Sequence, residues 1–165
     1  MPTIDEIIAL DQLTLREHTE SAGDVLDPKQ QRERLEKSLP ISQVCSVRRN
    51  GDLVAYAMMH PESNGGWFVT AFNTHPQQRS APVLQELFSK FAALAHEVGV
   101  TELKSHVYKT NRLSMSFHRR LGFRITKENA KGVEFVATLA EVSASRAIER
   151  SAKKLGFSSA SPNDG

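Results

Sequence analysis

The chain has 165 residues with a formal net charge of +2, and 39% of its residues are hydrophobic and 24% charged. This length fits one domain, and so small a charge indicates neither a nucleic-acid nor a membrane partner. The single cysteine, Cys45, excludes an internal disulfide or a multi-cysteine metal site, and we expect a buried, inert thiol. No stretch approaches the roughly 20 apolar residues of a membrane span, and the first residues lack a secretory pattern. We therefore expect a cytoplasmic protein.

Two helices are predicted in the first 40 residues. Apolar residues recur at helical spacing over 4–18, which indicates an amphipathic helix that lies on a core. The second helix has Asp27 as N-cap, Pro28 at the first helical position and Gln30 at the capping-box position, and Pro40 ends it. Its high charge predicts that most of its surface faces solvent.

A change to period two indicates strands from residue 42 onward. Two runs rich in valine and tyrosine lie on either side of Asn50-Gly51, a strong hairpin signal. A third strand is predicted over 67–74, a long helix over 81–98 and a further strand over 102–108. Strand, helix and strand form a right-handed crossover, so the two strands should lie parallel.

The C-terminal part predicts a helix over 112–121, two strands around the turn "AKG", and a last helix over 141–155. The fold class is therefore α/β with a mixed sheet, mostly antiparallel with a central parallel β-α-β crossover and helices on both faces. We expect residues 1–140 to form the single domain, and 141–165 to form a C-terminal helix and a mobile tail. The basic stretch 146–154 is either a solvated helix face or a surface for an acidic partner.

Ligand-binding residues are expected after the carboxyl ends of the two parallel strands, at 73–82 and 109–114. The second segment continues as "NRLSMSFHRRLGF", residues 111–123. This series resembles the GNAT superfamily of N-acyltransferases, whose helix here reads Asn, a small residue at plus three, an apolar residue and Tyr at plus six and seven, then Leu-Gly-Phe. Ser114 takes the small position, and His118 stands where the family usually has Tyr.

The resemblance extends over about 42–139. Thr74-His75-Pro76 falls where GNAT proteins commonly have Val-His-Pro, and Arg79 falls on the Arg that opens their pyrophosphate loop. It implies a GNAT-like domain that takes acetyl-CoA or another acyl-CoA as co-substrate and passes the acyl group to an amine by direct attack. The strands over 67–74 and 103–108 would splay apart and hold pantetheine between them.

The same resemblance implies catalytic roles. His118 would protonate the departing thiolate, and Ser114, one turn earlier on the same helix face, would orient it. A backbone N–H near Asn73 would stabilise the oxyanion. The candidates for the base are His60, Glu62 and His75, and a water relay is the alternative.

The implied cofactor-binding residues come from the third strand, the following turn and the start of the helix at 112–121. They are Phe72, Asn73, Thr74, Arg79, Ser80, Ala81, Val83 and Asn111. The turn departs from the family pattern, because Pro82 and Leu84 occupy its two small positions. Pro82 has no N–H, so Ala81 and Val83 would be the amide donors, together with the helix dipole and Arg79.

Three functions stay open on this basis. The first is an acetyltransferase with a rearranged pyrophosphate site, and the second an acyltransferase whose donor is a carrier-protein pantetheine thioester. The third is a GNAT-like binding or regulatory module without catalysis. The acceptor amine belongs to a small molecule or a protein, and a homodimer is an open alternative. In this family the N-terminal helices and the turn after Met59 usually shape the acceptor side. Here these segments carry charged residues that are compatible with an amine acceptor and equally with a solvated surface: Glu17, His18, Glu20, Glu33, Glu36 and Glu62.

Overall fold

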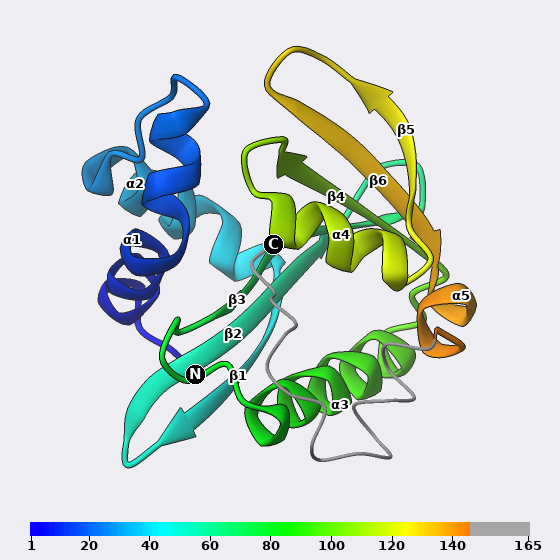
Figure 1. Cartoon of the computed structure of the whole chain (residues 1–165). Helices are drawn as coiled ribbons and strands as arrows, with labels where there is room; N and C mark the ends of the chain where they lie inside the picture. Colours follow the sequence, from blue (N-terminus) through cyan, green and yellow to red (C-terminus); the bar gives the residue numbers. More distant parts are fainter. Residues whose placement is uncertain (146–165) are drawn as a thin grey trace.

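The computed structural model describes residues 1–145. It contains a sheet with helices on both sides (Figure 1). In chain order the elements are α1 (Ile4–Ser21), α2 (Pro28–Ser38), the 3-10 turn η1 (Leu39–Ile41), β1 (Gln43–Arg49), β2 (Asp52–Pro61), β3 (Trp67–Thr74), α3 (Ala81–Glu97), β4 (Glu102–Tyr108), α4 (Arg112–Arg120), β5 (Arg124–Glu128), β6 (Gly132–Thr138) and α5 (Leu139–Ser143).

The sheet is mixed, with the six described strands in the order β1-β2-β3-β4-β6-β5. Neighbours among them are antiparallel except β3 and β4, which are parallel and joined through α3. The predicted β-α-β crossover is therefore confirmed, and with it the mixed α/β class. Because this crossover puts the parallel pair in the middle of the sheet, the carboxyl ends of β3 and β4 face one common edge.

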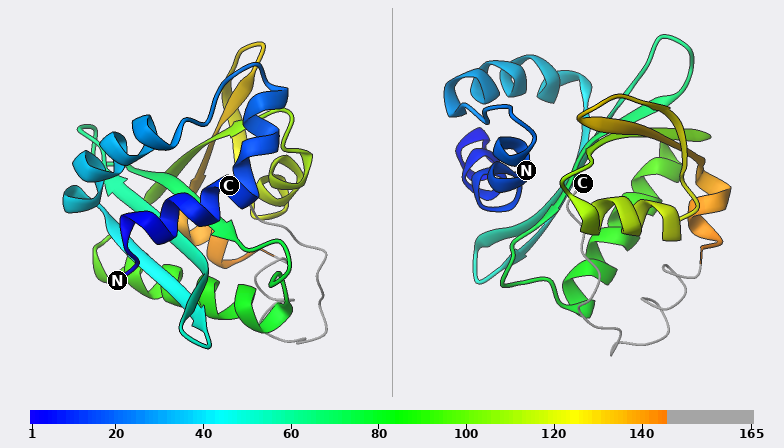
Figure 2. Two further views of the ribbon diagram at one scale, coloured as in Figure 1. Left: turned by 90° about the vertical axis from the view of Figure 1, so that its left-hand side faces the viewer. Right: turned by 45° about the horizontal axis from the view of Figure 1, so that its top comes forward.

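The helices form two layers. Figure 2 shows α1 and α2 on one side of the sheet and α3, α4 and α5 on the other. The α1 side has a small core that includes Ile7, Leu35 and Tyr56. The α3 side has the larger core, in which Leu84 and Phe135 are almost fully buried. Each sheet face is thus apolar where a helix covers it, as alternation along the strands requires.

Local signals in the sequence explain most boundaries. Asn50 and Gly51 both have positive φ, 54° and 84°, which is the type I′ turn that the hairpin prediction requires. Asp27 caps α2, but its carboxylate accepts from the N–H of Lys29. The predicted capping box with Gln30 is therefore wrong. Ser80 takes the N-cap position of α3 without a side-chain cap bond.

The C-terminal prediction is corrected in its described part. A short helix covers 139–143, two residues earlier than the predicted start at Glu141, because Thr138 forms a capping box with Glu141. The rest of the predicted helix, the basic stretch 146–154 and the predicted tail lie outside the described residues. Among the residues described, no helix has the length and apolarity needed to cross a membrane.

Candidate functional site

The central feature is the place where β3 and β4 part. The two strands pair at Trp67–Leu103, Phe68–Lys104 and Val69–Ser105, and pairing among the described residues ends there. Yet β3 continues to residue 74 and β4 to residue 108. The splay implied by the family resemblance is thus present, and it leaves a gap between the two strands.

A β-bulge marks the same point on β3. Val69 pairs with Met59 of β2 and Ala71 pairs with Met58, so Thr70 is the extra residue. A bulge bends its strand and turns backbone groups away from the ladder. The backbone of 70–74 therefore runs beside the gap, where an extended ligand could pair with it. Burying such groups without a partner would cost about 1–3 kcal/mol each.

On the α3 side of the gap, three buried polar side chains meet. His118 Nδ1 lies 2.8 Å from the carbonyl oxygen of Ser114 and 3.2 Å from its hydroxyl, and His118 Nε2 lies 3.1 Å from Ser105 Oγ. The imidazole also stacks on Phe135 at 4.9 Å. The predicted contact between Ser114 and His118 is present, and Ser105 is a partner that sequence reasoning missed.

These contacts argue against the acid role predicted for His118. A carbonyl oxygen only accepts, so Nδ1 carries the proton and Nε2 accepts from the Ser105 hydroxyl. Burial lowers the pKa of His118 from 6.5 to about 4, against a smaller opposite effect of the Ser114 carbonyl. The imidazole is therefore neutral at pH 7, and neither ring nitrogen presents a proton to the gap. Its geometry suits positioning Ser105 and closing an apolar wall.

An apolar cavity of about 250 Å³ opens beside this cluster. Its walls come from the paired ends of β3 and β4, from α3 and α4, and from α5. Phe72, Phe88 and Phe117 form an aromatic group on it, with ring centroids 5.0 to 6.5 Å apart. Phe72 is thus a core residue that also lines this cavity, and Trp67 packs against the same core.

The turn before α3 contains no glycine, but Pro82 and Leu84 obstruct the start of the helix less than the sequence suggests. The side chain of Leu84 is 1% exposed and packs into the core, so it does not cover the start of the helix. Ala81 and Val83 are also buried, while Pro82 is exposed. First-turn N–H groups have no partner within a helix, so the turn loses only the N–H that Pro82 lacks.

Other predicted cofactor residues are spread over both faces. Arg79 Nε donates to Thr74 Oγ1 at 3.3 Å, which ties the turn to the end of β3. Asn111 caps α4, accepting from the N–H of Ser114 at 3.2 Å. The side chain of Asn73 points to the opposite, α1 side, where it donates to Asp11. Only the backbone of Asn73 can therefore serve the gap.

Asp11 is a buried carboxylate that no sequence pattern singles out. Tyr56 Oη donates to it at 2.7 Å, and Asn73 Nδ2 and Gln31 Nε2 donate to it at 2.7 and 2.5 Å. Burial raises the pKa of Asp11 from 3.8 to about 6, although the three hydrogen bonds oppose this shift. The cluster joins α1, α2, β2 and β3.

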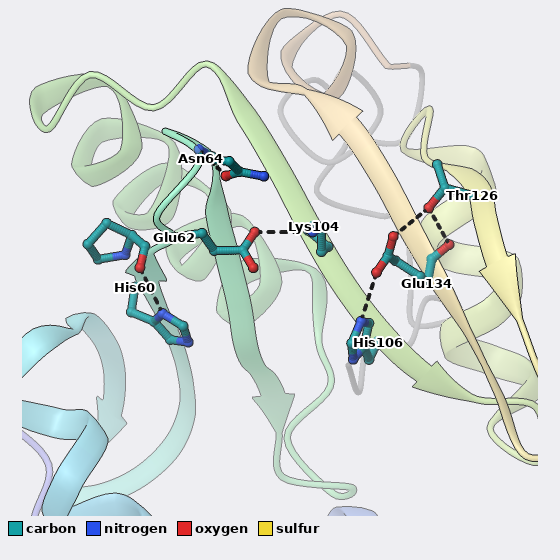
Figure 3. A network of polar contacts seen from close by, with 9 residues as sticks. His60, Glu62, Asn64, Lys104, His106, Thr126 and Glu134 are labelled. Atoms are coloured by element: carbon teal, nitrogen blue, oxygen red, sulfur yellow. Dashed lines mark hydrogen bonds and ion pairs between the residues drawn. The ribbon is translucent and has the colours of Figure 1, made fainter.

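On the face of β4 opposite Ser105, His106 stands next to the gap. Its Nε2 lies 3.2 Å from Glu134 Oε2, and Thr126 Oγ1 donates to the other carboxylate oxygen of Glu134 at 2.8 Å (Figure 3). Its ring meets Phe68 edge-on at 4.8 Å, and His60 stacks on the other side of Phe68 at 5.7 Å. The side chain of His106 is 60% exposed, so a substrate can reach it.

The charge on Glu134 suits a histidine partner. Burial favours its neutral form, but hydrogen bonds from Thr126 and His106 and the charges of Lys104 and Lys127 prevail, so the pKa is lowered. Glu134 is therefore ionised at neutral pH and can stabilise a protonated His106. Sequence reasoning passed over His106 because its partner comes from another hairpin.

A surface cleft of about 690 Å³ adjoins His106 and Glu134. Tyr108 and Lys131, on its wall, both bind Asp24 in the loop after α1, the tyrosine at 2.8 Å. The loop between the N-terminal helices is thus fastened to β4 and to the β5–β6 turn. The cleft and the α3-side cavity lie on opposite faces of the sheet.

Two of the predicted base candidates, His60 and Glu62, lie near His106, whereas His75 lies in the turn after β3. His60 Nδ1 is 3.2 Å from the carbonyl oxygen of Pro61, Glu62 pairs with Lys104 at 3.4 Å, and His75 accepts from the N–H of Gln77. The charged residues expected on the acceptor side do not form a single cluster. Glu17, Glu20, Glu33 and Glu36 are exposed on α1 and α2, and the carbonyl oxygen of His18 accepts from Thr110.

Comparisons with known proteins agree with this fold. A model of the Acetyltransferase (GNAT) family matches residues 7–123. No curated protein matches the sequence significantly.

Solved structures with a similar fold include the PaiA N-acetyltransferase from Thermoplasma acidophilum in complex with coenzyme A, at 10% identity and a TM-score of 0.65 over 82% of this chain and 92% of that one. An acetyltransferase from Thermus thermophilus has a TM-score of 0.65 at 15% identity, over 82% and 90%. An aminoglycoside 6'-acetyltransferase type Ii has a TM-score of 0.62 at 16% identity, over 82% and 89%. Identities this low support a common fold.

Proposed function

Because the chain belongs to the Acetyltransferase (GNAT) family, we propose that it transfers an acyl group from an acyl-CoA thioester to an amine by direct attack in the gap between β3 and β4. The observation that carries the proposal is the parting of these strands after Val69 and Ser105, beside the bulge at Thr70. Consecutive residues of β4 then face the two sides, Ser105 the cavity and His106 the cleft.

The donor is assigned to the α3 side. The amide groups of pantetheine need hydrogen-bond partners, and the backbone of 70–74 supplies them next to the gap. The phosphates would lie at the N-terminus of α3, where Ala81 and Val83 offer N–H groups and Arg79 a positive charge. The structure of the Thermoplasma neighbour contains coenzyme A, which supports the choice of donor.

The acceptor is assigned to the cleft, with His106 as general base. A neutral amine attacks the thioester carbonyl carbon, the C–N bond forms, and its surplus proton passes to His106, whose imidazolium Glu134 stabilises. The C–S bond then breaks. A thiol of this kind has a pKa near 8.5, so coenzyme A can leave as thiolate and take a proton from water. No buried acid is required, in agreement with a neutral His118.

A coupled assay tests this function. We expect acetyl-CoA to bind, and thiol release to depend on an added amine when an aminoglycoside, a diamine and a peptide with a free N-terminus are offered in turn. Calorimetry without detectable heat at millimolar acetyl-CoA would contradict the proposal. Transfer from acetyl-pantetheine but not from acetyl-CoA would replace it by the carrier-protein alternative.

A further inference from the structure

The cavity on the α3 side is larger and more apolar than an acetyl group requires. It has a volume of about 250 Å³, and its lining includes Val69 and Ser105, the last pair before the gap. Residues of α3 and α4 line it as well, together with Leu139 and Val142 of α5. We propose that it binds the hydrocarbon chain of a medium-chain acyl donor. This inference rests on the proposed function, because it names the acyl group that the thioester carries.

The lining favours a chain without polar groups. Phe88, Phe117 and Leu121 are representative of its walls, and the few polar lining groups already have partners or lie at the rim. His118 and Ser105 bond to each other at 3.1 Å, and Gln85, Ser89 and Ser143 are partly or fully exposed. The two amides of pantetheine would lose their hydrogen bonds in such a cavity, whereas methylene groups lose nothing.

The neutral state of His118 is also compatible with an alkyl chain in the cavity. A charged imidazolium beside an alkyl chain would be costly to bury, whereas the neutral ring, stacked on Phe135 and held by Ser114 and Ser105, forms part of an apolar wall. Its contact with Ser105 places that wall next to the gap. The buried His118 thus forms part of the chain-binding wall, with its Nδ1 proton bound to the carbonyl oxygen of Ser114.

The volume sets the chain length. An apolar cavity of about 150 Å³ binds benzene, so about 250 Å³ accommodates a chain of roughly six carbons with room to spare. Each methylene group removed from water contributes about 0.8 kcal/mol, equivalent to roughly a fourfold gain in affinity. Affinity should therefore rise from acetyl-CoA to hexanoyl-CoA.

Calorimetry with coenzyme A, acetyl-CoA and hexanoyl-CoA tests the inference. We expect hexanoyl-CoA to bind at least tenfold more tightly than acetyl-CoA. Ala92→Phe, which puts a ring into the cavity from α3, should reduce this ratio to near one. Ala93→Phe is the matched control, because both alanines are exposed on α3 but only Ala92 lines the cavity. It should leave the ratio unchanged.

The outcomes separate the two proposals. Equal binding of all three ligands would overturn the chain site and leave the proposed function intact. A preference for hexanoyl-CoA that survives Ala92→Phe would place the chain elsewhere and also overturn it. Binding of none of the three would overturn the proposed function, and the chain site with it.

Discussion

His106→Gln is expected to lower kcat by about 10²- to 10⁴-fold, with the affinity for acyl-CoA unchanged. Glutamine keeps a polar side chain beside Glu134 but cannot take a proton from the amine. His106 lies on the cleft side of β4, so its loss should not disturb a donor bound on the other face. Steady-state kinetics with calorimetric measurement of acyl-CoA binding would show this separation.

His60→Gln is the matched control for this prediction. His60 stacks on the same Phe68 from the other side, but its ring nitrogen contacts the carbonyl oxygen of Pro61, where His106 contacts a carboxylate. We expect its kcat to stay within a few-fold of the wild type. If His60→Gln proved as damaging as His106→Gln, the rate would depend on the aromatic surface and His106 would not be the base.

Two buried groups should make the free energy of unfolding depend on pH in opposite directions. His118 has a pKa of about 4 in the folded state against 6.5, so the unfolded chain binds more protons between these values. Its contribution, about 3 kcal/mol, is present above pH 6.5 and lost as the pH falls to 4. Asp11 has a pKa of about 6 against 3.8, so its contribution, also about 3 kcal/mol, is present below pH 3.8 and lost as the pH rises to 6.

Chemical denaturation of His118→Gln and Asp11→Asn across pH 4 to 7 measures these effects. The wild-type free energy of unfolding relative to His118→Gln should fall by about 3 kcal/mol from pH 7 to pH 4. Relative to Asp11→Asn it should rise over the same interval. Taking differences from the wild type removes the contribution of the exposed groups. Two differences that stay constant with pH would show that neither group is desolvated in the folded protein.

The sequence predicts the framework of this protein well because its signals are local. Asn50-Gly51 specifies a turn, Asp27-Pro28 begins a helix, and the alternation in 67–74 indicates a strand; each is confirmed within a few residues. The parallel strand pair follows from chirality once strand, helix and strand are recognised. These features depend on neighbours in the chain and require no tertiary contacts.

The site was less predictable, because its partners come from distant segments. The role proposed for His106 depends on its contact with Glu134 on another strand, and that of His118 depends on its contact with Ser105. The spacing of these residues along the chain does not predict either contact. The interpretation of His118 as an acid rested on the family's Tyr position, without knowledge of its burial. Leu84 likewise looked like an obstacle at the turn until the structure showed it turned into the core.

Hydrogen exchange in the presence of coenzyme A tests most directly the claim that the gap between β3 and β4 holds the donor. We predict that the backbone N–H groups of 70–74 exchange markedly more slowly when coenzyme A is bound. Those of β1, at the far edge of the sheet, should not change. Binding of coenzyme A without protection of 70–74 would contradict the account, because the ligand would then lie outside the gap.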